Sequence, residues 1–230
     1  MQHAGHFGPV PTGPGVGCSP RHRLGARCLL ARSARPGGLS ARTEAADVDA
    51  PNLLVAYQSV EGHTQQVAER IAERLRAGGA LVTLTTAAEA PSPTRFDGVV
   101  VGDPIHAGQH TRELTAYLKT HAATLERIPT ALFQVCLTSA DRTPEKLAAT
   151  GAYVTSLTEA TGCTPDLVAR FAGALRYTQY GRLKRAFMRR IAAGSGRSTD
   201  TSTDHVLTDW DEVDGFADDV LLLVRSPHRA

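Results

Sequence analysis

From residue 52 onward, short apolar runs alternate with segments whose apolar residues recur at helical spacing. The first run, 52–57 (NLLVAY), is continuously apolar, as expected of a strand that is covered on both faces of a sheet. In the next segment, 64–76, Val67, Ile71 and Leu75 fall on one helical face, and a Gly-Gly pair ends the pattern. The remaining pattern predicts strands at 80–86, 96–102, 130–138 and 167–175, helices at 111–121, 144–161 and 211–224, and a short connecting segment at 205–210.

Apolar strands that alternate with helices are typical of a doubly wound α/β fold, in which helices cover both faces of a parallel sheet. Ligands of such folds bind outside the carboxyl ends of the strands. We therefore expect the functional site in three loops, 58–64, 102–111 and 137–143. Thr143 is expected to cap the helix that begins at Pro144.

The first 50 residues differ from the rest of the chain. They are rich in Gly, Pro, Ser, Ala and Arg, and Glu44 is their first acidic residue, so we interpret 1–50 as a disordered extension. An Arg-rich, acid-poor start is also a feature of transit peptides, although the Pro and Gly clustered in 8–16 argue against an amphipathic presequence. We expect one folded domain at 51–226 and a short tail at 227–230.

Composition sets broad limits on function. The chain has 230 residues, 42% of them hydrophobic, which suffices for one α/β core, and its net charge of +2 favours no nucleic-acid partner. The cysteines form no C-x-x-C pair, and no apolar run approaches the roughly 18 residues of a membrane span. These features favour a reducing, cytoplasmic location.

The loop after the first strand has the chemistry of an anion site. Ser59 and Thr64 offer hydroxyl donors, Gly62 permits close backbone approach, and the following helix presents unpaired N–H groups. The loop has no Lys or Arg, and Glu61 stands in its middle, so we expect the Glu61 carboxylate to point away from the anion. The Gly-Lys-Ser/Thr of nucleoside-triphosphate loops and the G-x-G-x-x-G of dinucleotide folds are both missing here. A capped helix start without a ligand is the alternative interpretation.

Several longer stretches resemble a known family. The segments LLVAYQSVEGHTQQVAERIAERL and FDGVVVGDPIHAGQH are similar to the first and third strands of flavodoxins with their flavin loops. The segments AGALRY, SGRSTDT and LTDW resemble the flavodoxin-like, menaquinone-dependent protoporphyrinogen IX dehydrogenase family over about 52–224. The resemblance implies a five-stranded sheet of order 2-1-3-4-5, an FMN cofactor, a tetrapyrrole substrate, and menaquinone as electron acceptor.

The resemblance also implies which residues bind FMN. The matching positions in the three loops are Ser59, Val60, Glu61, Gly62, His63, Thr64, Gln65, Pro104, Ile105, His106, Ala107, Gly108, Leu137, Thr138, Ser139 and Ala140. The chain departs from its relatives at Asp103, Ala107 and Gln109, and loops 102–111 and 137–143 contain no Trp or Tyr to flank a flavin. Tyr177 or Tyr180 is the expected replacement.

A basic insertion at about 178–204 lies near the fifth strand. Within 181–194, Leu183, Phe187 and Ile191 form an apolar stripe among five basic residues. Such a segment can lie on an anionic membrane near a lipid-soluble quinone, bind substrate carboxylates, or pack on the domain with its charges in solvent.

Two residues are candidates for a catalytic role. His106 is placed to tune the flavin or relay a proton, or is a plain loop histidine. Arg176 is a partner for an acidic substrate group or forms a structural ion pair. We expect no metal site, because His106 and His110 have no carboxylate or thiolate set nearby.

Three functional hypotheses remain. The leading one is an FMN enzyme of heme biosynthesis, cytoplasmic and peripheral on the inner face of the cell membrane, that oxidises protoporphyrinogen IX and reduces menaquinone. The second is a flavodoxin-like electron carrier that transforms no substrate of its own. The third is a binding module that has lost FMN.

Overall fold

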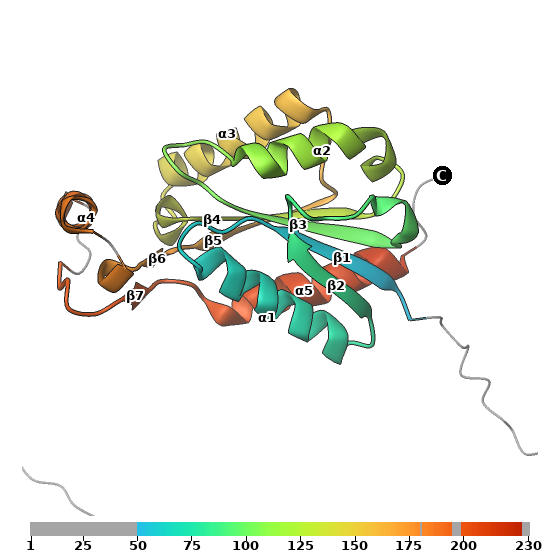
Figure 1. Ribbon diagram of the computed structural model, residues 1–230, viewed down its shortest axis with the longest axis horizontal. Coiled ribbons are helices and arrows are strands. Elements are labelled where there is room, and N and C mark those ends of the chain that lie inside the picture. Colours follow the sequence, from blue (N-terminus) through green and yellow to red (C-terminus); the bar gives the residue numbers. More distant parts are fainter. Residues whose placement is uncertain (1–49, 180, 195–198, 227–230) are drawn as a thin grey trace, which may run out of the picture. The chain divides into compact units, whose positions relative to one another are not determined.

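Five parallel strands form the centre of the fold (Figure 1), in a computed structural model that describes residues 50–179, 181–194 and 199–226. Their spatial order is β2-β1-β3-β4-β5, and every neighbouring pair is parallel, so the predicted order 2-1-3-4-5 is confirmed. The strands are β1 (Asn52–Tyr57), β2 (Leu81–Thr86), β3 (Gly98–Pro104), β4 (Thr130–Cys136) and β5 (Leu167–Ala172).

Helices cover both faces of this sheet, as predicted. Helices α1 and α5 lie on one face, and α2 and α3 lie on the other (Figure 1). Each face buries its own apolar cluster, which explains why β1 and β3 are apolar at successive positions rather than at every second one. The helices are α1 (His63–Ala77), α2 (Arg112–Leu125), α3 (Pro144–Thr161) and α5 (Trp210–Arg225).

Two helix ends lie at the residues where the sequence predicts them. The Thr143 hydroxyl accepts a hydrogen bond from the Lys146 backbone N–H at 3.4 Å, so the predicted cap of α3 is confirmed. Gly78 ends α1, and its N–H donates to the Arg74 carbonyl at 3.0 Å. Local sequence therefore determines the start of α3 and the end of α1.

The fold's aromatic centre depends on one glycine. Phe133 of β4 is fully buried, and its ring packs against Phe171 and Phe216, with centroid distances of 6.0 and 6.3 Å. A Cβ at Gly102 would lie 1.9 Å from Phe133 Cζ, so only glycine leaves room for the ring at this position of β3. The Phe133 ring therefore packs directly against the β3 backbone at Gly102, near the carboxyl end of the strand.

The prediction of one long strand at 167–175 was wrong. Strand β5 stops at Ala172, and the two-residue strand β6 (Ala174–Leu175) pairs antiparallel with β7 (His205–Val206) in a separate small sheet. The break falls at Gly173, whose N–H donates to the Cys136 carbonyl and whose carbonyl accepts from Leu207 N–H. The predicted strand 130–138 was likewise two residues too long, because a 3-10 turn, η2 (Leu137–Ala140), follows β4.

The small β6–β7 sheet leads into and out of the basic insertion. A short turn, η3 (Tyr177–Gln179), and helix α4 (Arg182–Gly194) lie between its two strands, beside the carboxyl end of the main sheet (Figure 1). Ala192 of α4 packs with Leu175 and Tyr177 in a third apolar cluster. The predicted stripe side chains of Leu183, Phe187 and Ile191 lie outside the described part of the chain, as do Tyr180, the 1–49 extension and the 227–230 tail.

None of the described helices is both long enough and apolar enough to cross a membrane.

Candidate functional site

The loop between β1 and α1 leaves the start of the helix open. Gly62 stands at the N-cap position with φ of +80°, a conformation that favours glycine, and it offers no side chain to cap the helix. The first turn of α1 contains no acidic residue. The helix therefore presents uncapped N–H groups and the positive end of its dipole to the loop.

The Ser59 hydroxyl and three backbone N–H groups of this loop have no hydrogen-bond partner within the described chain. The Ser59 hydroxyl oxygen is buried and makes no hydrogen bond there. No described group accepts a hydrogen bond from the backbone N–H of Gly62, His63 or Thr64. Because buried donors are normally satisfied, this cradle of unpaired donors fits an anionic oxygen-rich group such as a phosphate.

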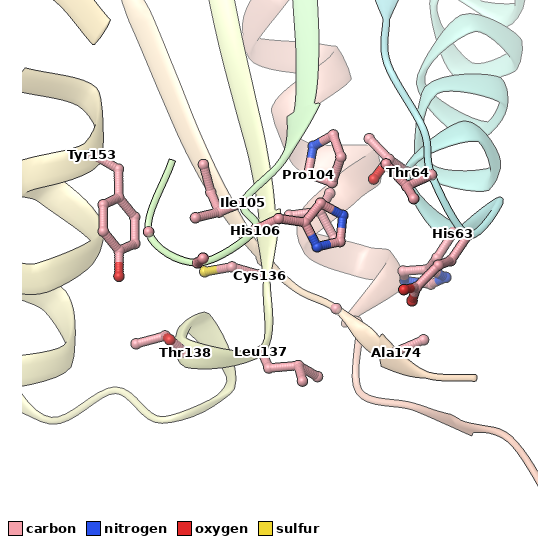
Figure 2. A pocket seen from close by; sticks show the side chains of 16 residues that line it. His63, Thr64, Pro104, Ile105, His106, Cys136, Leu137, Thr138, Tyr153 and Ala174 are labelled. Atoms are coloured by element: carbon pink, nitrogen blue, oxygen red, sulfur yellow. The ribbon is translucent and has the colours of Figure 1, made fainter. Parts of the chain in front are cut away.

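A cavity of about 520 Å³ begins at this loop and extends along the carboxyl ends of the strands (Figure 2). Its size suits a small organic ligand or cofactor. All three predicted loops contribute to its wall. From the predicted set, the cavity is lined by Val60, Glu61, His63, Thr64, Pro104, Ile105, His106, Ala107, Gly108, Leu137 and Thr138.

Five predicted residues do not line this cavity. Ser59 lies at the base of the first loop, whereas Gly62 and Gln65 border a smaller hollow beside it that Glu61 also lines. Ser139 turns away, with its hydroxyl 3.0 Å from Cys136 Sγ, and Ala140 also lies outside the cavity wall. The expected outward orientation of the Glu61 carboxylate stays a prediction.

The second loop forms a tight hairpin over the cavity. His106 and Gln109 exchange two backbone hydrogen bonds of 3.1 and 3.0 Å, and Ala107 and Gly108 adopt φ of 51° and 77°. Two successive positive φ values are those of a type I′ turn. The hairpin leaves His106 exposed at the cavity rim.

Asp103 anchors the base of this hairpin. Its fully buried carboxylate accepts hydrogen bonds from Thr111 N–H at 2.7 Å, the Thr111 hydroxyl at 2.6 Å and His110 Nδ1 at 2.9 Å. This departure from the family pattern therefore fixes the start of α2 instead of facing the cavity. Among the described residues, no cluster of three or more His, Cys, Asp or Glu side chains could hold a metal ion.

The aromatic side chain of the cavity comes from an unexpected place. Tyr153 of α3 lines the cavity, and Figure 2 shows its ring on the side opposite His63. A Cβ added at Gly108 would lie 3.4 Å from Tyr153 Cε1, so the ring also supports the hairpin. Of the two tyrosines expected to supply a ring, Tyr177 is fully buried in the cluster with Leu175 and Ala192 and does not line the cavity, and Tyr180 lies outside the described residues.

Sequence reasoning also missed four other lining residues. Val135 and Cys136 end β4, and Gly173 and Ala174 span the break after β5. Their place beside the predicted loops follows from the parallel register, since Cys136 pairs with Ala172. Tyr153 has no such signal, because a tyrosine within a helical pattern does not reveal which cavity it faces.

His63 connects the first loop to the C-terminal part of the domain. Its buried ring places Nε2 2.6 Å from the Thr208 hydroxyl, which donates its own proton to the Ala172 carbonyl at 2.6 Å. His63 Nε2 therefore donates to Thr208. Burial lowers the pKa of His63, the hydrogen bond with Gln66 opposes this, and the charge of Arg176 lowers the pKa further.

Arg176 forms the ion-pair arrangement that was one of its two predicted roles. Its Nη2 donates to Gln66 Oε1 at 2.7 Å, and its Nη1 lies 3.8 Å from Asp204 Oδ2. The side chain is only 14% exposed. Arg176 thus ties the insertion to the first turns of α1.

Residues 54–202 match the family described as flavodoxin domain. The chain is 32% identical over 177 residues to a protein of Escherichia coli strain K12 named protoporphyrinogen IX dehydrogenase (quinone), covering 76% of this chain and 97% of that relative. A protein of the same name from Leishmania major is 30% identical over 176 residues, covering 75% of this chain and 76% of the relative.

Solved flavodoxin structures are also similar. An archaeal flavodoxin is 14% identical, with a TM-score of 0.42, covering 76% of this chain and 99% of that one. Oxidised flavodoxin 1 of Bacillus cereus is also 14% identical, with a TM-score of 0.43 and coverages of 74% and 97%.

Proposed function

The chain belongs to the flavodoxin-like protoporphyrinogen IX dehydrogenase family, and we propose that it oxidises protoporphyrinogen IX to protoporphyrin IX in heme biosynthesis and passes the electrons to menaquinone. It is an oxidoreductase that uses FMN, the cofactor of this family. The observation that carries the finer assignment is the convergence of three loops on one cavity, with the basic insertion packed beside its wall.

The residues of the first loop suit the phosphate of FMN. The buried Ser59 hydroxyl and the N–H groups at the start of α1 are donors without protein acceptors in the described chain. They would hold the phosphate, while Thr64 lines the neighbouring part of the cavity. Hydrogen bonds to a charged acceptor contribute about 1.5–3 kcal/mol each, so several donors bind a dianion without a basic residue in the loop.

The second and third loops suit the flavin ring. The hairpin residues 104–108, Leu137 and Thr138 form a largely apolar wall, and Tyr153 adds the aromatic surface that those loops lack. When bound, FMN supplies the hydride and electron chemistry. The protein excludes water, orients the ring and determines which substrate atoms approach it.

His106 is the residue we assign to proton transfer. Its side chain is exposed at the cavity rim, and its backbone is fixed by the hairpin bonds between His106 and Gln109. Removal of a hydride from a porphyrinogen is accompanied by loss of a proton from the same substrate, and an imidazole nitrogen at the cavity rim can accept that proton. Arg176 is not assigned to the substrate, since it does not line the main cavity.

Helix α4 is the segment we assign to the membrane and the quinone. Arg182, Arg189 and Arg190 are exposed on it, and 181–194 contains no acidic residue. Each basic residue near an anionic bilayer contributes about 1 kcal/mol. Ala192 packs on the cluster that contacts Leu137, so the helix adjoins the cavity wall, where a lipid-soluble quinone would need to enter. We accordingly propose a cytoplasmic protein, peripheral on the inner face of the cell membrane.

The deciding experiment is an anaerobic assay with purified protein. Porphyrin fluorescence would follow oxidation of protoporphyrinogen IX with menaquinone or ubiquinone as acceptor, beside the visible spectrum of bound flavin. Deletion of 181–194 should abolish quinone reduction and spare FMN binding.

A variant with Arg182, Arg189 and Arg190 changed to Gln should lose vesicle binding as well as most quinone reduction. The matched control changes three exposed arginines elsewhere, Arg95, Arg112 and Arg127, and should leave both unchanged. Full quinone activity in the deletion variant would overturn the assignment of α4 to the quinone. Purified protein that binds FMN but oxidises no protoporphyrinogen IX would favour the alternative, a flavodoxin-like electron carrier.

A further inference from the structure

A second hollow adjoins the phosphate-binding loop and contains a cation that the loop itself lacks. Residues 58–64 include no Lys or Arg. The guanidinium of Arg176 reaches this place from a segment more than a hundred residues later in the chain. The hollow is lined by Val60, Glu61, Gly62, Gln65, Gln66, Glu69 and Arg176.

The break in β5 is what delivers Arg176 to this hollow. The chain leaves the main sheet at Gly173, forms β6, and places Arg176 directly after Leu175. Its Nη2 then donates to the side chain of Gln66, whose own N–H donates to the Gly62 carbonyl at 3.2 Å. Arg176 is therefore joined through one side chain to the turn that carries the unpaired N–H groups.

The position of Arg176 is fixed from its other side as well. Its Nη1 lies 3.8 Å from the Asp204 carboxylate, which accepts hydrogen bonds from the Thr178 N–H at 2.9 Å and the Thr178 hydroxyl at 2.8 Å. With 14% of its side chain exposed, Arg176 is shielded from the solvent that weakens surface charges. A charge held this way keeps its position when a ligand arrives.

The local charges explain why a cation is needed here. Glu61 and Glu69 line the same hollow, and their carboxylates would repel a phosphate dianion bound at the loop. The start of α1 supplies only about half a positive charge. The charge of Arg176 already reaches this helix start, since it contributes to the lowered pKa of His63 after the larger effect of burial.

We propose that Arg176 is the cationic determinant of phosphate recognition, so that the site selects FMN over riboflavin through a residue supplied by the insertion side of the domain. This inference rests on the proposed function, because it concerns the phosphate of the same cofactor. It also gives the insertion a second role, since Asp204 and Thr178 hold the cation from within it. A purely structural ion pair would instead stabilise the domain and treat both flavins alike.

Paired titrations of the apoprotein with FMN and with riboflavin test this directly, with flavin fluorescence as the signal. For Arg176→Gln we expect the Kd for FMN to rise about 10- to 100-fold and that for riboflavin to stay within about twofold of wild type. Arg176→Lys should retain part of the preference for FMN. Added salt should weaken FMN binding of the wild type more than that of Arg176→Gln.

Two further variants make the result interpretable. Arg74→Gln removes an exposed arginine of helix α1, which is paired with Asp218 at 2.7 Å, and should change binding of neither flavin. Asp204→Asn keeps the cation but removes the carboxylate that holds it in place, so FMN binding should weaken while riboflavin binding stays unchanged. It also serves as the test if Arg176→Gln does not fold.

The titrations distinguish a failure of the proposed role of Arg176 from a failure of the proposed function. An equal loss for both flavins, or no loss for either, overturns the role of Arg176 while leaving the flavin enzyme intact. An Asp204→Asn variant that binds FMN as tightly as wild type, or that loses affinity for both flavins equally, also contradicts it. Wild-type protein that binds neither flavin refutes the proposed function itself.

Discussion

Substitution of Ser59 by alanine should stabilise the apoprotein and weaken its binding of FMN. Its hydroxyl oxygen is buried without a hydrogen-bond partner among the described residues, and an unsatisfied buried polar group costs about 1–3 kcal/mol. Ser59→Ala removes that cost, so the apoprotein should unfold at an equal or higher denaturant concentration, with a gain of up to about 1 kcal/mol.

The same change should weaken cofactor binding. If the hydroxyl donates to the phosphate of FMN, the lost charge-assisted hydrogen bond is worth about 1.5–3 kcal/mol, which raises the Kd roughly 10- to 150-fold. Riboflavin, which has no phosphate, should bind the variant and the wild type equally. Urea unfolding of the apoprotein and fluorescence titration with both flavins measure the two effects.

A matched serine provides the control for Ser59. Ser92 is exposed, with its hydroxyl 3.3 Å from that of Thr94, and Ser92→Ala should alter neither stability nor flavin binding measurably. A Ser59→Ala apoprotein that is less stable by 1 kcal/mol or more (roughly the value of a made hydrogen bond) would refute the reasoning, because the hydroxyl would then have a protein partner. Unchanged affinity for FMN would remove Ser59 from the phosphate site.

Three further predictions concern the ring site, the core and pH. Tyr153→Leu should raise the Kd for FMN about two- to tenfold and reduce the quenching of flavin fluorescence. Tyr153→Phe keeps the ring and should stay near wild type. Equal effects of the two substitutions would argue against an aromatic contact. Gly102→Ala places a Cβ 1.9 Å from Phe133, so its free energy of unfolding in urea should fall by about 1–3 kcal/mol or more. In the control Gly215→Ala, in α5, the added Cβ meets nothing within 4 Å, and the free energy of unfolding should rise by about 0.5–1 kcal/mol. The lowered pKa of His63 means that the unfolded chain binds a proton more readily, so its contribution to stability is present above about pH 6.5 and is lost as the pH falls below that value. Thermal unfolding of the apoprotein between about pH 5 and 7 should therefore show a decline that His63→Gln flattens, and an unchanged slope would contradict this origin.

Local chemistry along the chain was sufficient for the elements and for the general location of the site. Helix α3 begins and ends at the predicted residues because a capping threonine, a proline and a left-handed glycine act within a few positions. The apolar strands indicated a sheet covered on both faces, and that arrangement alone brings the ends of β1, β3 and β4 to one edge. The strand order and the cofactor came from the family resemblance rather than from the pattern.

The ends of the fourth and fifth strands could not be predicted in the same way. Apolar residues continue through 167–175, but the chain leaves the sheet at Gly173, where its backbone bonds to Cys136 and Leu207. Those partners are 37 and 34 residues away in sequence. Hydrophobic periodicity reports which face of an element is buried, and it carries no signal for where a neighbouring strand stops.

Long-range packing alone decided which side chains complete the site. Tyr153 reaches the cavity because α3 packs over the carboxyl end of the sheet, and Tyr177 is excluded because α4 buries it. Arg176 reaches the phosphate loop only through the redirected β6 and its contacts with Gln66 and Asp204. The sequence by itself thus determined most of the helices and strands, the fold class and the three loops, since local interactions encode them. The aromatic wall and the cation depended on contacts between distant segments, which form only when the whole chain folds.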